Sequence, residues 1–310
     1  MNNISFKNFY DENGYVIAKS LIKKELIDKV LIDLEQCKRG SRRYFSQSTH
    51  TWVKFSDLTE EGFLAESIQT PTKQISAGPL RKSVENLIVS KSISEKLAII
   101  SGGFDKFVIW QNMLFDKSTG TVDHADTWYL DTMPKGLMVA AWIALEDIHK
   151  DAGRFFVIPK SNKLGLEQNS SENISDHYAY AKFIDNYVNT KGLKRYAPPL
   201  KKGDVLFWHP NTIHGSFNQV SSSKSRKSIT CHYHPLGIGR KNQNSVSDIK
   251  KILKNLKPTE NESIFLDNVD PSEYIFFWNS LLNFYLNKYI LRKKNLESFL
   301  MNRQRVLKLL

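Results

Sequence analysis

Residues 138–145 read Met-Val-Ala-Ala-Trp-Ile-Ala-Leu, and residues 203–216 read Gly-Asp-Val-Leu-Phe-Trp-His-Pro-Asn-Thr-Ile-His-Gly-Ser. Each stretch holds a short run rich in β-forming residues, as expected for a β-strand. Further short β-rich runs lie at 107–114, 154–158 and 228–234. Runs this short and this frequent, separated by turns, are typical of a β-sandwich or barrel and not of alternating βαβ units. The sequence therefore predicts a mainly β core at about residues 105–235.

Helical patterns precede this core. Asn13-Gly14 is expected as a turn between a helix end and a strand. Apolar residues from Leu26 to Leu34 recur at intervals of three and four, which predicts an amphipathic helix capped by Ser20. A second helix is expected over Leu80–Leu97. The polar segment at 38–80 is expected to form surface loops that border a site. The polar segment at 160–200 is expected to be an insertion that covers one mouth of the barrel.

A third helical region is expected at the C-terminus. Asp270-Pro271-Ser272-Glu273 combines an N-cap, a proline at the first helical position and a carboxylate three residues after the cap. We therefore expect residues 1–240 to form one domain and residues 241–310 a helical extension packed on it. From Arg240 onward the chain has 13 Lys and Arg against 7 Asp and Glu, so this region carries 13 − 7 = +6.

The composition predicts a globular protein and decides little about function. Hydrophobic residues make up 41% of the 310 residues, which suffices for a packed core. The net charge is 44 − 32 = +12. Because the lysines are spread through almost every segment, this excess by itself indicates neither a nucleic acid nor a membrane surface as partner.

The two cysteines, Cys37 and Cys231, are too few for a disulfide framework or a thiolate zinc site, and both fit a reducing compartment. The first residues lack the long apolar segment of a secretory signal. No apolar stretch reaches the length of a membrane span. We therefore expect a cytoplasmic protein without membrane spans.

The sharpest local pattern is the H-x-D of Val122-Asp123-His124-Ala125-Asp126. Residues i and i+2 of an extended chain point to the same side, so His124 and Asp126 can offer an imidazole and a carboxylate to one metal ion. His214, on a strand across the barrel, can add a second imidazole. Such a set leaves three octahedral positions open, as suits non-haem Fe(II) that binds a chelating co-substrate and O2. An isolated H-x-D also arises by chance, and a lone histidine is more often structural, so the pattern needs support.

Arg226 gives that support, since it opens the strand that follows His214. A guanidinium stays charged and binds a carboxylate through two parallel hydrogen bonds, which suits the far end of a dicarboxylate. His209 competes with His214 for the third ligand position, because it could also face the pocket. We interpret His232 and His234 as supporting or core residues, and Trp208 as a core or pocket-wall residue.

These residues and the segments around them resemble the phytanoyl-CoA dioxygenase family of Fe(II)/2-oxoglutarate oxygenases. The resemblance covers residues 11–235, and the shared order of its segments is more specific than any one of them. The segments are Asp11-Glu12-Asn13-Gly14-Tyr15, His124-Ala125-Asp126, Trp142–Asp147, Gly153–Asn162, Gly203–Phe207, and His214-Gly215-Ser216 with Arg226. The resemblance implies a double-stranded β-helix, a cupin-like jelly roll with flanking N- and C-terminal helices, and makes residues 1–240 the dioxygenase domain.

The resemblance also implies the site and the reaction. The implied iron ligands are His124, Asp126 and His214; Arg226 and Ser216 hold the distal carboxylate of 2-oxoglutarate, Trp142 lines its pocket and Gln111 contacts its other end. The implied reaction uses 2-oxoglutarate and O2, releases succinate and CO2, and hydroxylates a small-molecule metabolite.

Three features of the sequence bear on the reaction and its substrate. The family's usual Pro-Gly-Ser-His is here Pro159-Lys160-Ser161-Asn162, which changes the rim of the pocket and leaves the substrate's identity open. The presence of Asp126 argues against a halogenase, because no ligand position is freed for a halide. Nucleic-acid demethylases related to this family carry a second arginine six residues after the first, whereas this chain has His232 there. We therefore do not expect a nucleic-acid substrate.

Arg154 and Lys160 replace residues that are usually small in a segment that, in this family, passes the mouth of the iron pocket. We expect them to bind an anionic group of the substrate, although a solvated Arg154 beside a loop is equally well supported. A rival hypothesis is a catalytically silent, cupin-like binding or scaffold protein that docks a partner through its basic C-terminal region. A decayed site should lack a ligand or the arginine, and here all four positions are filled.

Overall fold

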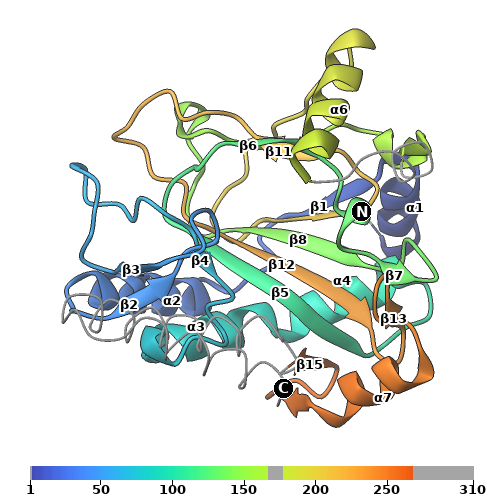
Figure 1. Cartoon of the computed structure of the whole chain (residues 1–310), viewed down its shortest axis with the longest axis horizontal. Coiled ribbons are helices and arrows are strands. Elements are labelled where there is room, and N and C mark those ends of the chain that lie inside the picture. Colours follow the sequence, from blue (N-terminus) through green and yellow to red (C-terminus); the bar gives the residue numbers. More distant parts are fainter. Residues whose placement is uncertain (1, 167–176, 268–310) are drawn as a thin grey trace, which may run out of the picture. The chain divides into compact units, whose positions relative to one another are not determined.

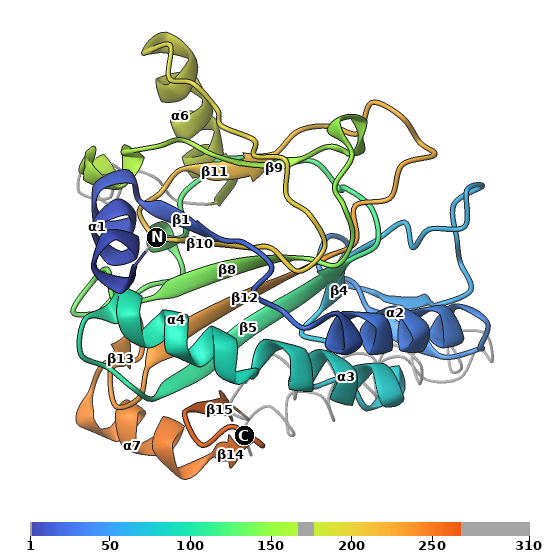
Figure 2. The ribbon, with the colours of Figure 1, turned by 180° about the vertical axis from the view of Figure 1, so that it is seen from behind.

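The chain folds into two facing β-sheets, described for residues 2–166 and 177–267 of a computed structural model. The large sheet has the order β1 (Tyr15–Ala18), β10 (Val205–Trp208), β8 (Val139–Ala144), β12 (Ser228–Pro235), β5 (Phe107–Phe115), β15 (Ile264–Asp267) and β14 (Leu256–Pro258), with β4 (Ile68–Gln69) paired to β5. The small sheet has the order β6 (Thr121–His124), β11 (His214–Ser216) and β9 (Phe155–Val157). Figures 1 and 2 show the small sheet over the large one. This arrangement confirms the predicted jelly roll.

The central strands of the large sheet are buried on both faces. In β8, Val139, Ala141 and Ile143 pack toward the helices. Ala140, Trp142 and Ala144 pack in a second cluster with Phe155 and Val157 of the small sheet. A strand covered on both faces has no solvent side to favour polar residues, which explains the unbroken apolar run at 138–145.

Helices cover the outer face of the large sheet (Figure 2). They are α2 (Lys24–Lys38), α3 (Pro79–Ile88) and α4 (Lys91–Ser101). The prediction of one helix over 80–97 is wrong, because Ser90 has an extended backbone, with φ −57° and ψ 144°, and divides two helices. The predicted cap at Ser20 is also wrong, since α2 begins four residues later, at Lys24, and Ser20 has a positive φ of 48°.

The N-terminal helix α1 (Asn3–Asn13) ends at Gly14, as the sequence predicted. Gly14 has a φ of 76°, and a Cβ at this position would lie 2.4 Å from Oγ1 of Thr212. Its carbonyl oxygen accepts hydrogen bonds from the Thr212 hydroxyl at 2.6 Å and the His209 amide at 2.9 Å. The turn after α1 therefore fixes the loop that leads to His214.

The polar region at 160–200 contains α6 (His177–Thr190), which lies beside β6 in Figure 1. Tyr180 of α6 stacks on Trp128 at a ring-centroid distance of 5.3 Å. After the helix, Arg195 donates hydrogen bonds from Nε to both carboxylate oxygens of Asp123, at 3.0 and 3.1 Å. The insertion therefore contacts the chain on both sides of the His124-Ala125-Asp126 segment, at Asp123 before it and at Trp128 after it.

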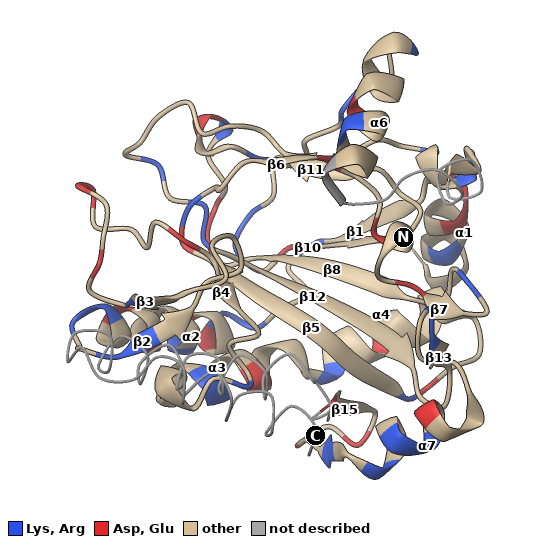
Figure 3. Ribbon diagram, viewed as in Figure 1, with Lys and Arg blue, Asp and Glu red and all other residues tan. Residues whose placement is uncertain are grey.

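Smaller elements complete the described residues. A hairpin of β2 (Arg43–Phe45) and β3 (Trp52–Lys54) occupies part of the loop region at 38–80, and single 3-10 turns lie at η1 (Ile75–Ala77), η3 (Lys150–Ala152) and η4 (Ser161–Lys163). Figure 3 shows Lys and Arg spread over helices and loops, in agreement with a dispersed net charge. Within 2–166 and 177–267, no helix is both long and apolar enough to cross a bilayer.

Past residue 240 the chain continues into the large sheet. After β13 (Gly239–Arg240), which pairs with β7 (Thr132–Met133), come α7 (Val246–Lys254) and the strands β14 and β15. β15 pairs in parallel with β5, and Arg240 forms a buried ion pair with Asp267 at 2.5 Å. Residues 241–267 are therefore not wholly helical. The helix predicted from Asp270 lies outside the described residues, so the proposed extension there stays a prediction.

Candidate metal and co-substrate site

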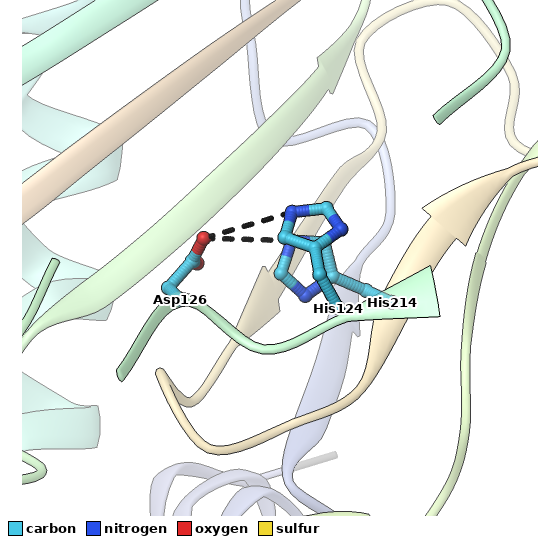
Figure 4. A group of neighbouring side chains, drawn as sticks. All are labelled: His124, Asp126 and His214. Atoms are coloured by element: carbon cyan, nitrogen blue, oxygen red, sulfur yellow. Dashed lines mark ion pairs between the residues drawn. The ribbon is translucent and has the colours of Figure 1, made fainter. Parts of the chain in front are cut away.

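The small sheet brings the predicted metal ligands to one point, as Figure 4 shows. His124 of β6 and His214 of β11 are paired across the two strands, with ring centroids 4.2 Å apart. Asp126 opens the 3-10 turn η2 (Asp126–Trp128) after β6. Its Oδ1 lies 4.0 Å from Nε2 of His124 and 3.7 Å from Nε2 of His214. One ligand atom from each residue lies within 4.8 Å of the others, so the three can bind one ion.

Backbone carbonyls set the orientation of both imidazoles. Nδ1 of His124 lies 2.9 Å from the Val122 carbonyl oxygen, and Nδ1 of His214 lies 2.9 Å from that of Thr212. Because a carbonyl oxygen can only accept, each Nδ1 carries the hydrogen and each Nε2 presents a lone pair. Hydrogen bonds of this kind are typical of metal-binding histidines.

The Asp126 carboxylate is 1% exposed and has three polar neighbours besides His124 and His214. Oδ2 accepts a hydrogen bond from the Trp208 indole at 3.0 Å, and Oδ1 accepts one from the Tyr129 hydroxyl at 3.1 Å. Nε2 of His232 lies 3.5 Å from Oδ2. Burial raises the pKa of Asp126, but the neighbouring imidazoles lower it more, so this pKa lies below its usual value and the group is ionised.

The donor set fits Fe(II). Burial lowers the pKa of His214, which keeps this imidazole neutral and able to bind a cation. Two imidazoles and one carboxylate are the ligands of non-haem Fe(II) oxygenases, and they leave coordination positions for a chelating co-substrate and O2.

A cavity of about 530 Å³ joins the three ligands to Arg226. Arg226 is 2% exposed, and its Nη1 donates a long hydrogen bond of 3.4 Å to the Gly153 carbonyl. Its Nε has no hydrogen-bond partner, and no ion pair joins it to an acidic residue in the described parts of the chain. Burial lowers the pKa of Arg226 to about 10, so it remains a cation at neutral pH. A buried cation without an anionic partner is costly, which indicates an anion from outside the chain.

The other predicted co-substrate residues line the same cavity. The Trp142 ring centroid lies 5.9 Å from the Arg226 guanidinium, and Trp142 stacks on Phe155. Ser216 accepts a hydrogen bond from the Thr121 amide at 2.9 Å, which leaves its own hydroxyl hydrogen as a donor. Gln111 is paired with His232 across β5 and β12.

The structure brings neither Arg154 nor Lys160 to the cavity. Arg154 donates from Nε and Nη2 to the Ile148 carbonyl at 3.2 and 3.0 Å. Phe155 lines the cavity, and neighbouring residues of an extended chain point to opposite sides, so Arg154 points away. The Lys160 side chain is 62% exposed and pairs with Glu12 at 3.1 Å. The expectation of an anionic substrate was based on these two cations, and neither of them lines the cavity.

Several site residues were missed or only partly foreseen. Tyr129 was missed, although it follows Asp126 by three residues within one turn. Trp208 and His232 had been interpreted only as pocket wall, support or core, and both reach Asp126. His209 does not line the cavity. Its Nδ1 accepts a hydrogen bond from the Asn211 amide, and its ring centroid lies 6.3 Å from that of Tyr10. Gln47, Ser48 and His50, from the loop region expected to border a site, line the cavity as well.

A jelly roll with a His-Asp-His site and, in the same cavity, a buried arginine that has no acidic partner among the described residues defines an Fe(II)- and 2-oxoglutarate-dependent dioxygenase. Comparison with known families agrees: the model of the phytanoyl-CoA dioxygenase family matches residues 10–228. The chain belongs to the phytanoyl-CoA dioxygenase family.

Individual relatives are distant but similar over most of their length. The peroxisomal phytanoyl-CoA dioxygenase of Rattus norvegicus is 25% identical over 292 residues, covering 90% of this chain and 78% of the relative. Phytanoyl-CoA dioxygenase 1 of Oryza sativa subsp. japonica is 26% identical, covering 72% of this chain and 86% of the relative.

Solved structures show the same fold at lower identity. The α-ketoglutarate-dependent epimerase SnoN, in complex with Fe3+, α-ketoglutarate and nogalamycin RO, superposes with a TM-score of 0.57 at 14% identity, covering 85% of this chain and 98% of that one. The α-ketoglutarate-dependent carbocyclase SnoK has a TM-score of 0.56 at 18% identity, covering 83% and 92%.

Proposed function

We propose that this Fe(II)- and 2-oxoglutarate-dependent dioxygenase hydroxylates an uncharged, polar small molecule, with release of succinate and CO2. The observation that carries the proposal is the buried guanidinium of Arg226, which lacks an anionic partner in the same cavity as the three metal ligands. A dicarboxylate co-substrate supplies that anion.

The metal ligands, the arginine and the buried rings have separate tasks in this reaction. Iron, when bound by His124, Asp126 and His214, supplies the redox chemistry that couples decarboxylation of 2-oxoglutarate to oxidation of a substrate C–H bond. Arg226 and the Ser216 hydroxyl bind the distal carboxylate. Enclosure of the site by the buried rings of Trp142, Phe155 and Trp208 excludes water and strengthens these polar contacts.

The cavity wall supports an uncharged substrate. Its polar lining beyond the proposed co-substrate residues includes amides and hydroxyls, from Gln47, Ser48, Ser67, Thr119 and Thr121. Among the described lining residues, Asp126 and Arg226 are the only ones of the types Asp, Glu, Lys and Arg. Since both are assigned to the metal and the co-substrate, hydrogen bonds are left to orient the substrate.

Succinate formation tests the reaction. Purified protein with Fe(II), 2-oxoglutarate and O2 should form succinate slowly without substrate and faster with it. A metabolite library split into neutral and anionic members, read by a mass increase of one oxygen atom, then tests the substrate class. Hydroxylation confined to anionic members would contradict the proposal of an uncharged substrate.

The rival hypothesis of a silent scaffold gives a different result in the same assay. A scaffold with a preserved pocket would bind 2-oxoglutarate and form no succinate above the level of a metal-free sample. The unpaired Arg226 argues against a decayed pocket, since a buried cation is expensive to keep without a ligand.

We also propose a reducing compartment, because both cysteines are free and buried. The sequence favours the cytoplasm, whereas the rat relative is named peroxisomal. Fractionation of cells that express the full chain distinguishes the two locations.

A further inference from the structure

His232 is a buried cavity residue to which the site described above gives no task. It lies on β12, is 2% exposed and lines the cavity beside the metal ligands. Neither Nδ1 nor Nε2 has a hydrogen-bond partner in the described parts of the chain. Buried polar groups nearly always have partners, so an imidazole with two unpaired nitrogens in a ligand cavity indicates a missing ligand atom.

The position of His232 identifies the end of the cavity where this atom lies. Its Nε2 is 3.5 Å from Oδ2 of Asp126, which is long for a hydrogen bond, and Trp208 already donates to that oxygen at 3.0 Å. The His232 ring meets the Trp208 ring edge-on, with centroids 5.8 Å apart and an interplanar angle of 83°. His232 therefore lies at the metal end of the cavity. Its Nε2 is too far from Asp126 for a strong hydrogen bond and can bind another group.

Arg226 and His232 reach the cavity from one segment of chain. Arg226 comes two residues before β12 begins, and His232 lies within it. Six residues of extended chain span about 20 Å, so the two residues cannot serve one carboxylate equally well. A dicarboxylate that pairs with Arg226 through its distal end directs its other end toward the metal ligands and His232.

We propose that His232 donates a hydrogen bond from Nε2 to the 2-oxo-acid end of 2-oxoglutarate, beside Asp126. Nε2 is the donor nitrogen because its nearest polar neighbour, a carboxylate oxygen, can only accept. The co-substrate is thus held by the protein at both ends, by Arg226 at the distal carboxylate and by His232 at the metal end. This inference rests on the proposed use of 2-oxoglutarate.

Two ligands that differ at one end separate the roles. The probes are 2-oxoglutarate and 2-oxopentanoate, which has the same 2-oxo-acid end and a methyl group in place of the distal carboxylate. Binding is measured anaerobically to the Fe(II) protein through the visible charge-transfer band of the chelate, so no turnover is needed. His232→Leu should weaken both ligands by about 10- to 100-fold, the effect of one hydrogen bond to a charged group, and leave their affinity ratio unchanged. Arg226→Met should weaken the binding of 2-oxoglutarate but not of 2-oxopentanoate, so the ratio of the two affinities should approach one.

Two further variants act as controls. His232→Gln keeps an N–H donor and should bind both ligands more tightly than His232→Leu does. His209→Leu removes a half-buried imidazole that does not line the cavity, and should bind both ligands as the wild type does. Circular dichroism and the Tm of each variant report on folding.

Four results would overturn the inference. Unchanged binding in His232→Leu means that the ring only packs against Trp208. A changed affinity ratio means that His232 contacts the distal end. An equal loss in His232→Gln and His232→Leu means that shape, and not the donor, matters. A matching loss of Fe(II) affinity without co-substrate means that His232 acts through Asp126. Failure of the wild type to bind 2-oxoglutarate would instead contradict the proposed function, which keeps the two failures distinct.

Discussion

Trp208 donates its indole N–H to Oδ2 of Asp126 over 3.0 Å, while Oδ1 of the same carboxylate lies nearest to the imidazoles of His124 and His214. The two oxygens of this carboxylate therefore have separate partners. With Oδ2 engaged by the indole, Asp126 offers Oδ1 to a metal ion. We infer that Trp208 fixes which oxygen of Asp126 would face a bound metal ion.

Trp208→Phe removes the donor and keeps an aromatic ring against Phe155 and His214. We expect a loss of about 10- to 100-fold in Fe(II) affinity, typical for residues that orient a metal ligand, with a folded protein. Competition against a fluorescent chelator measures this affinity. Trp128→Phe is the matched control, because Trp128 stacks on Tyr180. Equal affinities in the two variants would show that the indole N–H has no such role.

Removal of any one metal ligand should abolish turnover. His124→Ala, Asp126→Ala and His214→Ala each delete one donor of a three-ligand site, so Fe(II) affinity and succinate formation should both be lost. The fold should persist, because the strands that carry these residues are held by backbone pairing. Metal titration with circular dichroism checks both statements. Wild-type activity in one variant would exclude that residue as a ligand.

Arg226→Ala should raise the KM for 2-oxoglutarate far more than the KM for the substrate. Loss of one partner of a buried charge pair typically costs about 2–5 kcal/mol, or roughly 30- to 4,000-fold in affinity. Arg226→Lys should rescue part of this loss, because an ammonium keeps the charge without the two parallel hydrogen bonds. A wild-type KM in both variants would assign the co-substrate to another cation.

Local sequence patterns predicted those parts of the site that depend on short-range geometry. His124 and Asp126 are two residues apart, so an extended backbone alone directs both toward one ion. The short run at 138–145 predicted a strand, and β8 forms there. The pairing of His214 with these ligands depended on the order of segments over the whole domain.

Other features depend on tertiary contacts that no local pattern contains. Trp208, His232 and Tyr129 meet at Asp126 from three segments of the chain, and only the folded sheets bring them together. Arg154 could have pointed into the cavity or away from it. It points away because its neighbour Phe155, at the start of β9, lines the cavity.

Buried neutral histidines predict an acid-sensitive fold. Burial lowers the pKa of His209 to about 4, whereas an unfolded histidine has a pKa near 6.5. Between these values the unfolded state binds a proton that the folded state does not, so stability falls as the pH falls from 6.5 to 4. The slope is about 1.4 kcal/mol per pH unit for each such histidine.

Urea unfolding of the metal-free protein at pH 7.5, 6 and 5 measures this effect. His214 and His234, whose pKa values are also lowered by burial, act in the same direction. His209→Gln should reduce the slope by one group and leave the others. A wild-type slope in this variant would mean that His209 titrates normally in the folded protein.

Arg154 provides the last prediction, because its two hydrogen bonds to the Ile148 carbonyl give it a structural role outside the cavity. Arg154→Ala should lower the free energy of unfolding by about 1 kcal/mol, the usual net value of a hydrogen bond at a partly exposed site. The KM values for 2-oxoglutarate and for the substrate should not change. Arg154→Lys, which can donate only from a single nitrogen, should recover part of the stability. A raised substrate KM at saturating 2-oxoglutarate would instead restore Arg154 to the substrate site and favour an anionic substrate.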